Sequence, residues 1–557
     1  MFKKIILPSI ITLVLGAINY YLTLPALHIK SASFWGFIFF LIIVWLISRF
    51  VLAGAVKLAS IIKGEAKTDY SKRKIFGGEG KIKLKKWHKT VIISVVAVVV
   101  LAAAVIFATS TPVFNAAKYQ KMLTVTEADF SKDIAEIPLS QIPVVDRDTA
   151  MRLGSRKIGE VVELVSQFNV SGYYTQINYN QVPVRVSPLE YADLLKWFVN
   201  KGDGIPYYVK IDMATQDTEL VELEKGMRYS PSEYFARDLM RHARFAYPTK
   251  MFEHTSFEID DSGNPYWIIS YYDYTIGFLG GKDIAGIIAV DAVTGEMKDY
   301  PVSEVPQWID AVYSADMIIQ QADYWGAYKN GFWNSIFTQK NVVATTDGYN
   351  YLAINDDVWL YTGITSVVDD ESNVGFILVN LRTKQAKTFA INGAEEYSAM
   401  ESAQGMIQEK GYTATFPILV NIADTPSYFI SLKDDAGLVK AYSFVSVSNY
   451  QIVGVADTLA GAQNEYIRLL KDSGKISEDT KLPDENEIKT VSGTVEKISS
   501  AVVNGNSKYY ILVTGNETVF VADISLSEKL PLVTVGEKLE IKYYTDEKGS
   551  ITVTQID

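Results

Sequence analysis

The sequence predicts an α+β membrane protein with an N-terminal three-helix transmembrane region, an ectodomain of repeated antiparallel hairpin-plus-helix units, and a small C-terminal β-barrel. Three observations lead to this prediction. Three long apolar runs lie within residues 1–110, a strand–turn–strand pattern recurs four times after them, and five short strand-like segments follow a charged stretch near the end. Apolar runs of this length are typical of membrane spans, and the short alternating segments are typical of strands.

The apolar run at residues 91–108, VIISVVAVVVLAAAVIFA, contains no charge. A helix of this length, rising about 1.5 Å per residue, crosses a hydrocarbon core of about 30 Å. Eleven Lys and Arg lie just before it, in a loop at residues 57–89. Short basic loops stay on the cytoplasmic side of a membrane. We therefore expect this loop inside the cell and the remainder of the chain, after residue 108, outside.

Two earlier apolar runs, at residues 5–24 and 31–52, are each long enough to form a membrane helix. Lys3 and Lys4 precede the first run and favour a cytoplasmic N-terminus. A secretory signal peptide is the alternative, but no small-residue cleavage site separates the two runs. The sequence thus predicts a multi-pass protein of the cell membrane whose large C-terminal part is extracytoplasmic.

One helix would anchor the same ectodomain, so the first two helices need another explanation. They carry small and polar residues that allow close helix contact, namely Gly16, Asn19, Tyr20, Tyr21 and Gly54. Such residues serve contacts with another membrane protein and packing of helices on one another equally well. We favour packing of the helices on one another.

The N-terminal part of the chain is basic, and the rest is acidic. Residues 1–110 hold 15 Lys and Arg against three acidic residues, a net charge of +12, so the formal charge of −11 leaves −23 on the rest. An acidic exterior repels phosphate backbones, and we expect no nucleic-acid ligand. The chain has no cysteine, which excludes disulfides and cysteine-ligated metal and favours a bacterial envelope with a single membrane.

The repeated unit is a β-branched residue followed by Asp, Asn or Ser, two further residues, and then Thr or Asn. It occurs at Ile287 to Met297, Tyr208 to Thr218, Phe376 to Ala386 and Ser443 to Val453. We expect each to be an antiparallel hairpin with its turn near Thr294, Thr215, Thr383 or Asn449. The short polar side chains at these positions bond to backbone amides in turns, which explains them without a ligand.

A helical pattern follows each hairpin, and we expect the helix to cover one face of the sheet. The four segments are Pro231 to Ala243, Val305 to Ala322, Ala394 to Glu409 and Thr458 to Leu470. A strand rich in aromatic residues precedes three of the hairpins, at Tyr266 to Tyr272, Tyr349 to Tyr361 and Tyr428 to Leu432. Residues 111–470 are thus predicted to form one or more α+β domains.

A helix followed by antiparallel strands that end in Val290-Asp291-Ala292-Val293-Thr294-Gly295-Glu296 resembles the PepSY domain of bacterial envelope proteins. The match is best over residues 230–300. The units around Asn380 and Ser446 lack the glycine and the acidic residues. The resemblance implies a non-catalytic module that binds or restrains extracytoplasmic proteins.

Residues 471–490 are charged, contain Pro483 and lack apolar periodicity, so they are predicted to form a linker. Residues 491–557 follow as a separate domain with strands expected at Gly493 to Ile498, Tyr509 to Thr514, Thr518 to Ala522, Lys538 to Tyr544 and Ile551 to Gln555. This order resembles an OB-like barrel. Because the domain is extracytoplasmic, we expect it to contact protein or glycan, or to act as a structural cap.

No catalytic, metal-binding or cofactor-binding motif is recognisable. The chain has only four histidines, His28, His88, His242 and His254, and none of them forms an H-E-x-x-H pattern. Acidic pairs occur at Asp260-Asp261, Asp356-Asp357, Asp369-Asp370 and Asp434-Asp435, and we interpret them as solvated turn residues. Two carboxylates from distant positions could nevertheless form a glycosidase-like site.

The most suggestive surface is a segment rich in aromatic residues. Its candidate binding residues are Tyr324, Trp325, Tyr328, Phe332 and Trp333. Aromatic faces stack on sugars and fill protein hot spots, but they also fill cores, and the neighbouring Ile318 and Ile319 favour a core role.

These observations predict a membrane-anchored bacterial envelope protein whose extracytoplasmic domains bind or scaffold other envelope components, without enzymatic activity and without a cofactor. The expected partners are the membrane, other envelope or membrane proteins, and cell-wall glycan. An envelope hydrolase that acts on glycan or peptide through paired carboxylates is the alternative.

Overall fold

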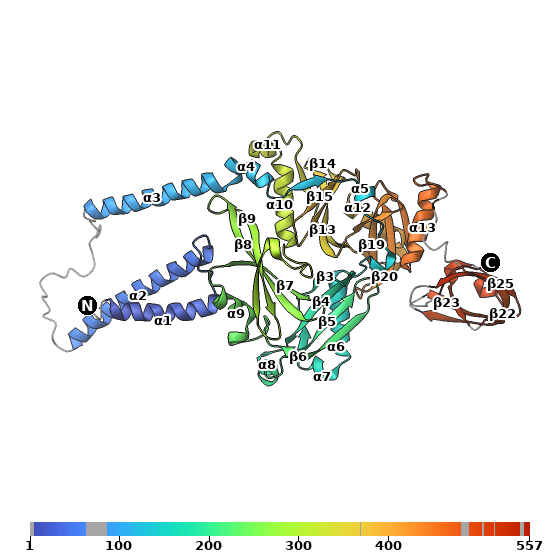
Figure 1. Ribbon diagram of the computed structural model, residues 1–557, viewed down its shortest axis with the longest axis horizontal. Coiled ribbons are helices and arrows are strands. Elements are labelled where there is room, and N and C mark those ends of the chain that lie inside the picture. The colour runs from blue at the N-terminus through green and yellow to red at the C-terminus, as the bar shows by residue number, and fades with distance from the viewer. Residues whose placement is uncertain are drawn as a thin grey trace, which may run out of the picture. The chain divides into compact units, whose positions relative to one another are not determined.

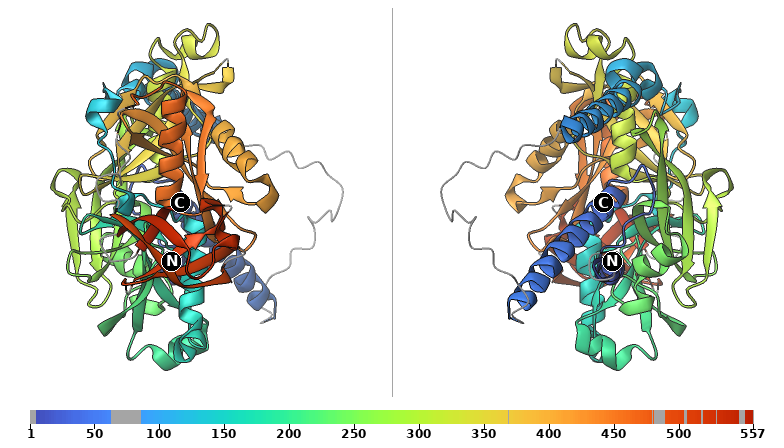
Figure 2. Two further views of the ribbon diagram at one scale, coloured as in Figure 1. Left: turned by 90° about the vertical axis from the view of Figure 1, so that its right-hand side faces the viewer. Right: turned by 90° about the vertical axis from the view of Figure 1, so that its left-hand side faces the viewer.

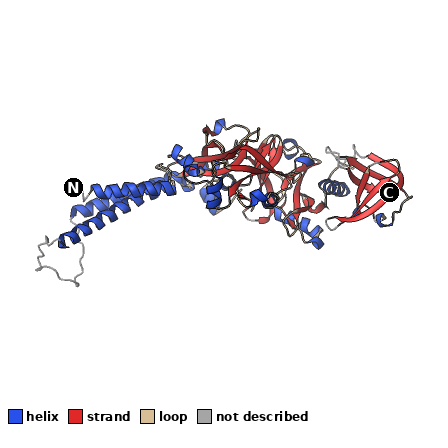
Figure 3. Ribbon diagram, turned by 90° about the horizontal axis from the view of Figure 1, so that it is seen from below, coloured by secondary structure: helices blue, strands red, loops and turns tan. Residues whose placement is uncertain are grey.

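The computed structural model describes residues 5–62, 86–367, 369–478, 480, 489–503, 506–516, 518–527, 529–545 and 551–556. Contacts between residues divide the chain into two compact units, Met1–Gln463 and Asn464–Asp557. Figure 1 labels the helices and strands, and Figure 3 shows that the N-terminal part is helical whereas the remaining chain contains the strands together with shorter helices and loops. The mixed α+β class that the sequence predicts is confirmed.

Three helices near the N-terminus are long and apolar enough to cross a membrane. They are α1 (Ile6–Thr23), α2 (Ala32–Ile62) and α3 (Lys86–Ser110). The apolar helices at residues 5–24, 31–52 and 91–108 are therefore confirmed, although α2 and α3 extend into the flanking basic sequence. Most of the predicted basic loop 57–89 lies outside the described residues.

Helices α1 and α2 pack side by side (Figure 1). Gly16 lies so close to α2 that a Cβ atom on it would come within 2.5 Å of Leu41 Cδ2. The rings of Tyr20 and Phe37 meet edge to face at 5.9 Å. Packing of these helices on one another, which we favour from the sequence, is confirmed for Gly16 and Tyr20.

The described residues of the first unit form four β-sheets. The first sheet consists of β2 (Phe168–Val170), β3 (Thr175–Tyr179), β4 (Val182–Tyr191), β5 (Ile205–Asp212) and β6 (Thr218–Met227). The second consists of β7 (Met251–Ile259), β8 (Pro265–Ile276), β9 (Gly280–Asp291) and β10 (Met297–Pro301). Strands within each of these two sheets pair antiparallel.

The third sheet consists of β1 (Val125–Glu127), β11 (Val343–Thr345), β12 (Asn350–Ile354), β13 (Asp357–Ser366), β14 (Asp369–Asn380), β15 (Ala386–Phe389) and β16 (Gly393–Ala394). The fourth consists of β17 (Thr413–Ala414), β18 (Ile418–Ile422), β19 (Thr425–Lys433), β20 (Val439–Ser446) and β21 (Asn449–Ala456). Strand β1 pairs parallel with β15, so the chain that leaves α3 adds a strand to the third sheet.

The helices that follow α3 are short. They are α4 (Pro112–Gln120), α5 (Phe130–Asp133), α6 (Arg147–Gly159), α7 (Val162–Val165), α8 (Leu194–Asn200), α9 (Leu239–Ala246), α10 (Ala315–Ala327), α11 (Phe332–Ile336), α12 (Glu396–Met406) and α13 (Leu459–Asp472). Figure 1 and Figure 2 both show α4 beside α10, at the end of α3.

Two of the predicted helices begin later than the sequence suggests. The helix expected from Pro231 begins at Leu239, because Asp238 caps it and accepts a hydrogen bond from Arg241 N at 2.8 Å. The helix expected from Val305 begins at Ala315, after the N-cap Ser314. In both cases apolar residues in the irregular segment before the helix imitate helical periodicity ahead of the true cap.

The sheet β7–β10 is buried on both faces. Ile268 and Ala289 belong to a core that also contains Ile318 of α10 and residues of β13 and β14. On the opposite face, the Trp267 ring packs edge to face against Tyr173 at 5.1 Å, and Val290 is the strand partner of Trp267. Helix α10 covers one face of this sheet, as expected, together with the third sheet, and the first sheet covers the other face, where Tyr208 contacts Phe257.

Antiparallel strand pairs occupy all four of the expected hairpin positions. In the turn after β9, Asp291 Oδ1 accepts hydrogen bonds from Val293 N and Thr294 N at 2.8 and 2.9 Å. Asp212 and Asn380 each accept the same two bonds in the turns after β5 and β14. The predicted use of these side chains as turn-forming groups is confirmed at these three positions.

The second unit contains a five-stranded sheet in the order β24-β23-β22-β25-β26. The strands are β22 (Lys489–Val503), β23 (Asn506–Val513), β24 (Val519–Asp523), β25 (Lys538–Thr545) and β26 (Ile551–Ile556). The first strand is longer than predicted, and the second begins three residues earlier than expected. In the predicted linker 471–490, residues 479 and 481–488 lie outside the described residues, and α13 continues to Asp472.

Candidate functional site

The five aromatic residues singled out from the sequence lie on α10, on α11 and between them. Trp325 packs against the core between α10 and the third sheet, as the core interpretation predicts. Tyr324 and Tyr328 stack with their ring centroids 5.8 Å apart, and Tyr119 of α4 meets Tyr324 edge to face at 5.0 Å. The core position of Trp325 thus explains why this residue is aromatic, whereas Tyr324 and Tyr328 belong to a series of ring contacts.

This series of rings continues to the surface. Tyr328 contacts Phe332 at 6.2 Å, Phe332 contacts Trp333 at 5.4 Å, and Trp333 stacks on Phe337 at 5.8 Å. The side chains of Trp333 and Phe337 are 61% and 74% exposed. We call Tyr119, Tyr324, Tyr328, Phe332, Trp333 and Phe337 the aromatic ladder. It leads from α4 to an exposed apolar tip, and α4 directly follows α3.

The tip of the β8–β9 hairpin contacts the ends of the long apolar helices. Ser110 Oγ, at the end of α3, accepts hydrogen bonds from Phe278 N at 3.0 Å and Leu279 N at 3.1 Å. From the loop between α1 and α2, the ammonium group of Lys30 lies 2.8 Å from Asp273 Oδ1 of β8. The same hairpin therefore contacts both α3 and the α1–α2 loop.

A second contact joins the α1–α2 loop to α9. Arg244 is only 6% exposed, and its guanidinium donates to Leu24 O at 3.1 Å and to Tyr247 O at 3.3 Å. Leu27 N donates to Pro248 O at 2.7 Å. These bonds attach the α1–α2 loop to the sheet-containing part of the unit.

The sequence analysis missed an apolar face on α8. Leu194, Leu195, Phe198 and Val199 recur with helical spacing and are 53–75% exposed, and Phe235 nearby is 64% exposed. We call these five residues the α8 face. The segment Leu194-Leu195-Lys196-Trp197-Phe198-Val199 reads as an ordinary buried helix, and its only sequence signal is the density of apolar residues in a short stretch.

A buried polar group holds the α8 face in place. Trp197 is 7% exposed, and its indole N–H donates to Glu233 Oε2 at 2.7 Å. Tyr191 donates its hydroxyl to the other oxygen of Glu233 at 2.9 Å. The ring of Phe235 lies 5.9 Å from that of Trp197. Rigid aromatic support under an exposed apolar surface is typical of protein-binding hot spots.

Two buried carboxylates are the strongest chemical feature in the described part of the chain. Glu258 of β7 is fully buried and accepts hydrogen bonds from Asp310 N at 2.8 Å, Ala311 N at 3.1 Å and Ser256 Oγ at 2.8 Å. Asp310 is 1% exposed and accepts from Asn178 N at 2.7 Å and Val358 N at 3.2 Å. Through them, backbone amides of the first sheet (Asn178) and the third sheet (Val358) are linked to Glu258 of the second sheet.

Burial raises the pKa of Glu258 to about 7, and the hydrogen bonds it accepts oppose this effect only in part. Burial, and then the neighbouring charge of Glu258, raises the pKa of Asp310 well above its ordinary value. Neither carboxylate is open to a substrate, since both are buried and bonded to backbone amides. Their arrangement fits a structural joint.

The acidic pairs separate into two kinds. Asp260 and Asp434 are turn residues, as predicted, with Oδ1 of Asp260 accepting from Ser262 N at 3.0 Å and Oδ1 of Asp434 from Leu438 N at 3.0 Å. Asp357 contradicts the solvated-turn interpretation. It is 8% exposed and forms a bidentate ion pair with Arg382 at 2.6 and 3.0 Å. The local sequence cannot reveal this pair, because Arg382 belongs to a different hairpin.

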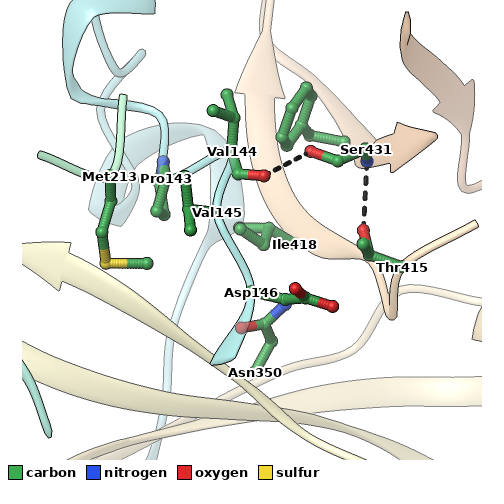
Figure 4. A pocket seen from close by; sticks show the side chains of 10 residues that line it. Pro143, Val144, Val145, Asp146, Met213, Asn350, Thr415, Ile418 and Ser431 are labelled. Carbon is green, nitrogen blue, oxygen red and sulfur yellow. Dashed lines mark hydrogen bonds between the residues drawn. The ribbon is translucent and has the colours of Figure 1, made fainter. Parts of the chain in front are cut away.

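The cavity drawn in Figure 4 is too small for a ligand larger than water. The cavity in Figure 4 has a volume of about 10 Å³, close to that of one water molecule, and its lining includes Met213, Ile418 and Asp146. Ser431 in its wall donates its hydroxyl to Val144 O at 2.8 Å, and its amide donates to Thr415 Oγ1 at 3.1 Å. Among the residues described, no group of three His, Asp or Glu side chains could hold a metal ion.

No protein-family profile matches this chain, and no curated protein sequence is detectably similar to it. Among solved structures, a levansucrase variant complexed with sucrose is 8% identical and aligns over 76% of this chain and 92% of its own, with a TM-score of 0.16. A mutant of levansucrase from Bacillus subtilis is 9% identical over 77% and 97%, also with a TM-score of 0.16. The polysaccharide lyase Uly1 is 7% identical over 70% and 77%, with a TM-score of 0.15. Similarities of this size carry no argument about fold or activity.

Proposed function

We propose that this protein is a membrane-anchored component of a bacterial envelope whose extracytoplasmic part binds or scaffolds other envelope proteins without catalysing a reaction. The observation that carries this proposal is the α8 face, five exposed apolar side chains held by the buried Trp197 and Glu233. Exposed apolar patches with rigid aromatic support mark protein contacts. The net charge of −23 after residue 110 disfavours nucleic acid as a partner.

The alternative, an envelope hydrolase with paired carboxylates, needs two carboxyl groups about 5 to 9.5 Å apart on either side of a substrate. Glu258 and Asp310 are two neighbouring buried carboxylates in the described residues, and both are engaged with backbone amides inside the protein. No observation on these residues favours the hydrolase.

The α8 face predicts a specific crosslink. A photo-crosslinking amino acid at Phe198, 63% exposed, should give a discrete adduct in intact envelopes. The adduct should disappear when Leu195 and Val199 are both replaced by aspartate, because charges at the centre of an apolar contact cost several kcal/mol of binding. The same crosslinker at Glu224, an exposed residue of β6, serves as the matched control. Equal labelling at both positions, or none at Phe198, contradicts the proposal.

We also propose that the α1–α2 hairpin begins and ends in the cytoplasm and that α3 exports the remaining chain. The basic residues between Lys57 and Lys89 support this orientation. Protease should cleave a tag at position 70 and a tag at the C-terminus from opposite sides of the membrane. Cleavage of both tags from one side would contradict the orientation.

For the ectodomain we propose that the hairpins β5–β6, β9–β10 and β14–β15 are copies of one PepSY-like unit. Asp212, Asp291 and Asn380 make the same pair of turn hydrogen bonds, which supports this. Residues Gln216, Gly295 and Lys384 share a left-handed backbone at φ 66°, 78° and 62°. A non-glycine residue can therefore take the glycine position of the motif. Ser446 and Asn449 form a different turn and support the fourth copy least.

For the second unit we propose an OB-like barrel that contacts protein or glycan. Its first strand pairs with the second and the fourth, and contacts between β24 and β26 bring the edges of the curved sheet together. These pairings support a closed five-strand barrel with a core that includes Phe520 and Ile541.

A further inference from the structure

The position of α11 relative to α3 suggests a second contact with the membrane. From Val91, about 20 helical residues cross a hydrocarbon core of about 30 Å, so the core ends near Ser110. After Ser110 the chain continues directly into α4, and this helical run ends at Gln120. Helix α11 packs beside α4 (Figure 1). If α3 spans the bilayer, α11 lies at the boundary between lipid and water.

Helices α4 and α11 expose large apolar side chains at this boundary, and α4 also exposes Lys118. Phe114 is 65% exposed, Trp333 61%, Ile336 50% and Phe337 74%. Trp333 and Phe337 stack on each other, and Phe107 and Phe114 meet edge to face at 6.1 Å. Tryptophan and phenylalanine with free apolar surface are typical of the interfacial region of membranes.

Hydrogen bonds from Asn330 and Asn334 close the segment that contains α11. Asn334 Nδ2 donates to Lys340 O at 3.0 Å, and Lys340 N donates to Asn334 Oδ1 at 3.2 Å. Asn330 Nδ2 donates to the same carbonyl at 2.9 Å. The turn thus satisfies its own backbone and leaves Trp333, Ile336 and Phe337 largely exposed.

The charge of this region is opposite to that of the rest of the ectodomain. Residues 111–126 and 324–346 contain Lys118, Lys121, Lys329 and Lys340 and no Asp or Glu, although Glu127, Asp323 and Asp347 border these segments, whereas the chain after residue 110 carries −23. A local basic surface next to a membrane helix attracts anionic headgroups. The acidic ectodomain as a whole repels anionic lipid, but the segments around α4 and α11 do not contribute to that repulsion.

We propose that α4 and α11 form an interfacial membrane contact, in which Phe114, Trp333, Ile336 and Phe337 insert at the headgroup boundary of a bilayer that contains anionic lipid. Through the aromatic ladder, this contact continues into α10 and its core. The bilayer would thus hold the ectodomain at a point away from the α1–α2 hairpin.

Since the chain has no cysteine, single cysteines can be labelled at chosen positions of the full-length protein. An environment-sensitive fluorophore would be attached at Phe337→Cys, with Val98→Cys in α3 and Tyr450→Cys on the β20–β21 hairpin as controls, since all three wild-type side chains are 47–74% exposed. The protein would be reconstituted into vesicles of phosphatidylcholine and phosphatidylglycerol. A second vesicle preparation would contain acyl chains that carry bromine, which quenches the fluorophore on contact.

We expect blue-shifted emission and quenching by brominated lipid at positions 98 and 337, and neither at 450. Replacing Trp333 and Ile336 together by glutamate should return position 337 to the emission of an aqueous site, without effect at 98. The interfacial contact is refuted if position 337 behaves as position 450 does while position 98 is quenched. The exposed apolar side chains of α11 would then be a contact surface for a protein or glycan rather than for lipid. If position 98 is not quenched either, the membrane anchoring on which the proposed function rests is refuted as well.

Discussion

Replacing Glu258 by alanine is expected to lower the free energy of unfolding of the first unit by at least about 3 kcal/mol, because a buried donor without an acceptor costs about 1–3 kcal/mol. The carboxylate accepts from Asp310 N, Ala311 N and Ser256 Oγ, and alanine would leave these three donors unpaired inside the protein. Thermal and denaturant unfolding of the full chain in detergent, followed by tryptophan fluorescence, would measure this loss. Glu224→Ala on exposed β6 is the control and should change stability by less than about 0.5 kcal/mol.

The same carboxylate predicts a pH dependence. Because the pKa of Glu258 is about 7 in the folded protein and its ordinary value is 4.5, the folded state holds this proton over a range in which the unfolded chain has lost it. Stability should therefore be fully present below pH 4.5 and fall as the pH rises through 7, by about 3 kcal/mol for this group. The raised pKa of Asp310 acts in the same direction.

Asp146 acts in a lower pH range and in the opposite direction. Burial opposes its ionisation, but hydrogen bonds from Lys433 and Thr149 outweigh burial and lower its pKa below the ordinary 3.8. Its stabilising contribution is lost only in acid, as the pH falls below that value. The two effects can thus be separated by measuring unfolding from about pH 3 to about pH 9.

The variant Glu258→Gln cannot ionise, so its stability should change less than that of the wild type between pH 4.5 and about 7. In acid this variant is also expected to be less stable than the wild type. Its amide NH₂ group takes the place of one carboxyl oxygen and faces a backbone N–H that donates to that oxygen in the wild type. An unchanged slope in Glu258→Gln would contradict the assignment of this titration to Glu258.

Features set by neighbouring residues could be predicted from the sequence. The three apolar helices follow from the length of their uncharged runs. The turns at Asp212, Asp291 and Asn380 follow from a side chain that bonds to amides two and three residues later. In each case the group and its partner lie within a few residues of each other, so the pattern in the sequence contains the whole interaction.

Features set by distant residues could not be predicted. Glu258 reads as an alternating polar position of a strand, and its burial depends on Asp310, 52 residues later, and on the first sheet. Asp357 looks like a turn residue until Arg382 is placed beside it. The α8 face and the exposed end of the aromatic ladder look like core segments, because apolar residues give the same pattern whether or not another element covers them.

Replacing Val290 by aspartate should be as destabilising as any substitution in the β9 strand. Val290 is fully buried and lies opposite Trp267 on β8, so a carboxylate there would be desolvated without a donor. We expect a loss of at least about 3 kcal/mol in the free energy of unfolding. Lys298→Ala, at an exposed position of β10, should stay within about 0.5 kcal/mol.

Ala289→Asp distinguishes a sheet covered on one face from a sheet covered on both. Ala289 is 4% exposed and points into the core shared with Ile268 and Ile318, opposite to Val290. In a hairpin with one open face, aspartate at one of these two neighbouring positions would reach water and be tolerated. Because the first sheet covers one face and α10 with the third sheet covers the other, both aspartate variants should lower the melting temperature strongly. A melting temperature of Ala289→Asp near that of Lys298→Ala would contradict the two-sided packing of β9.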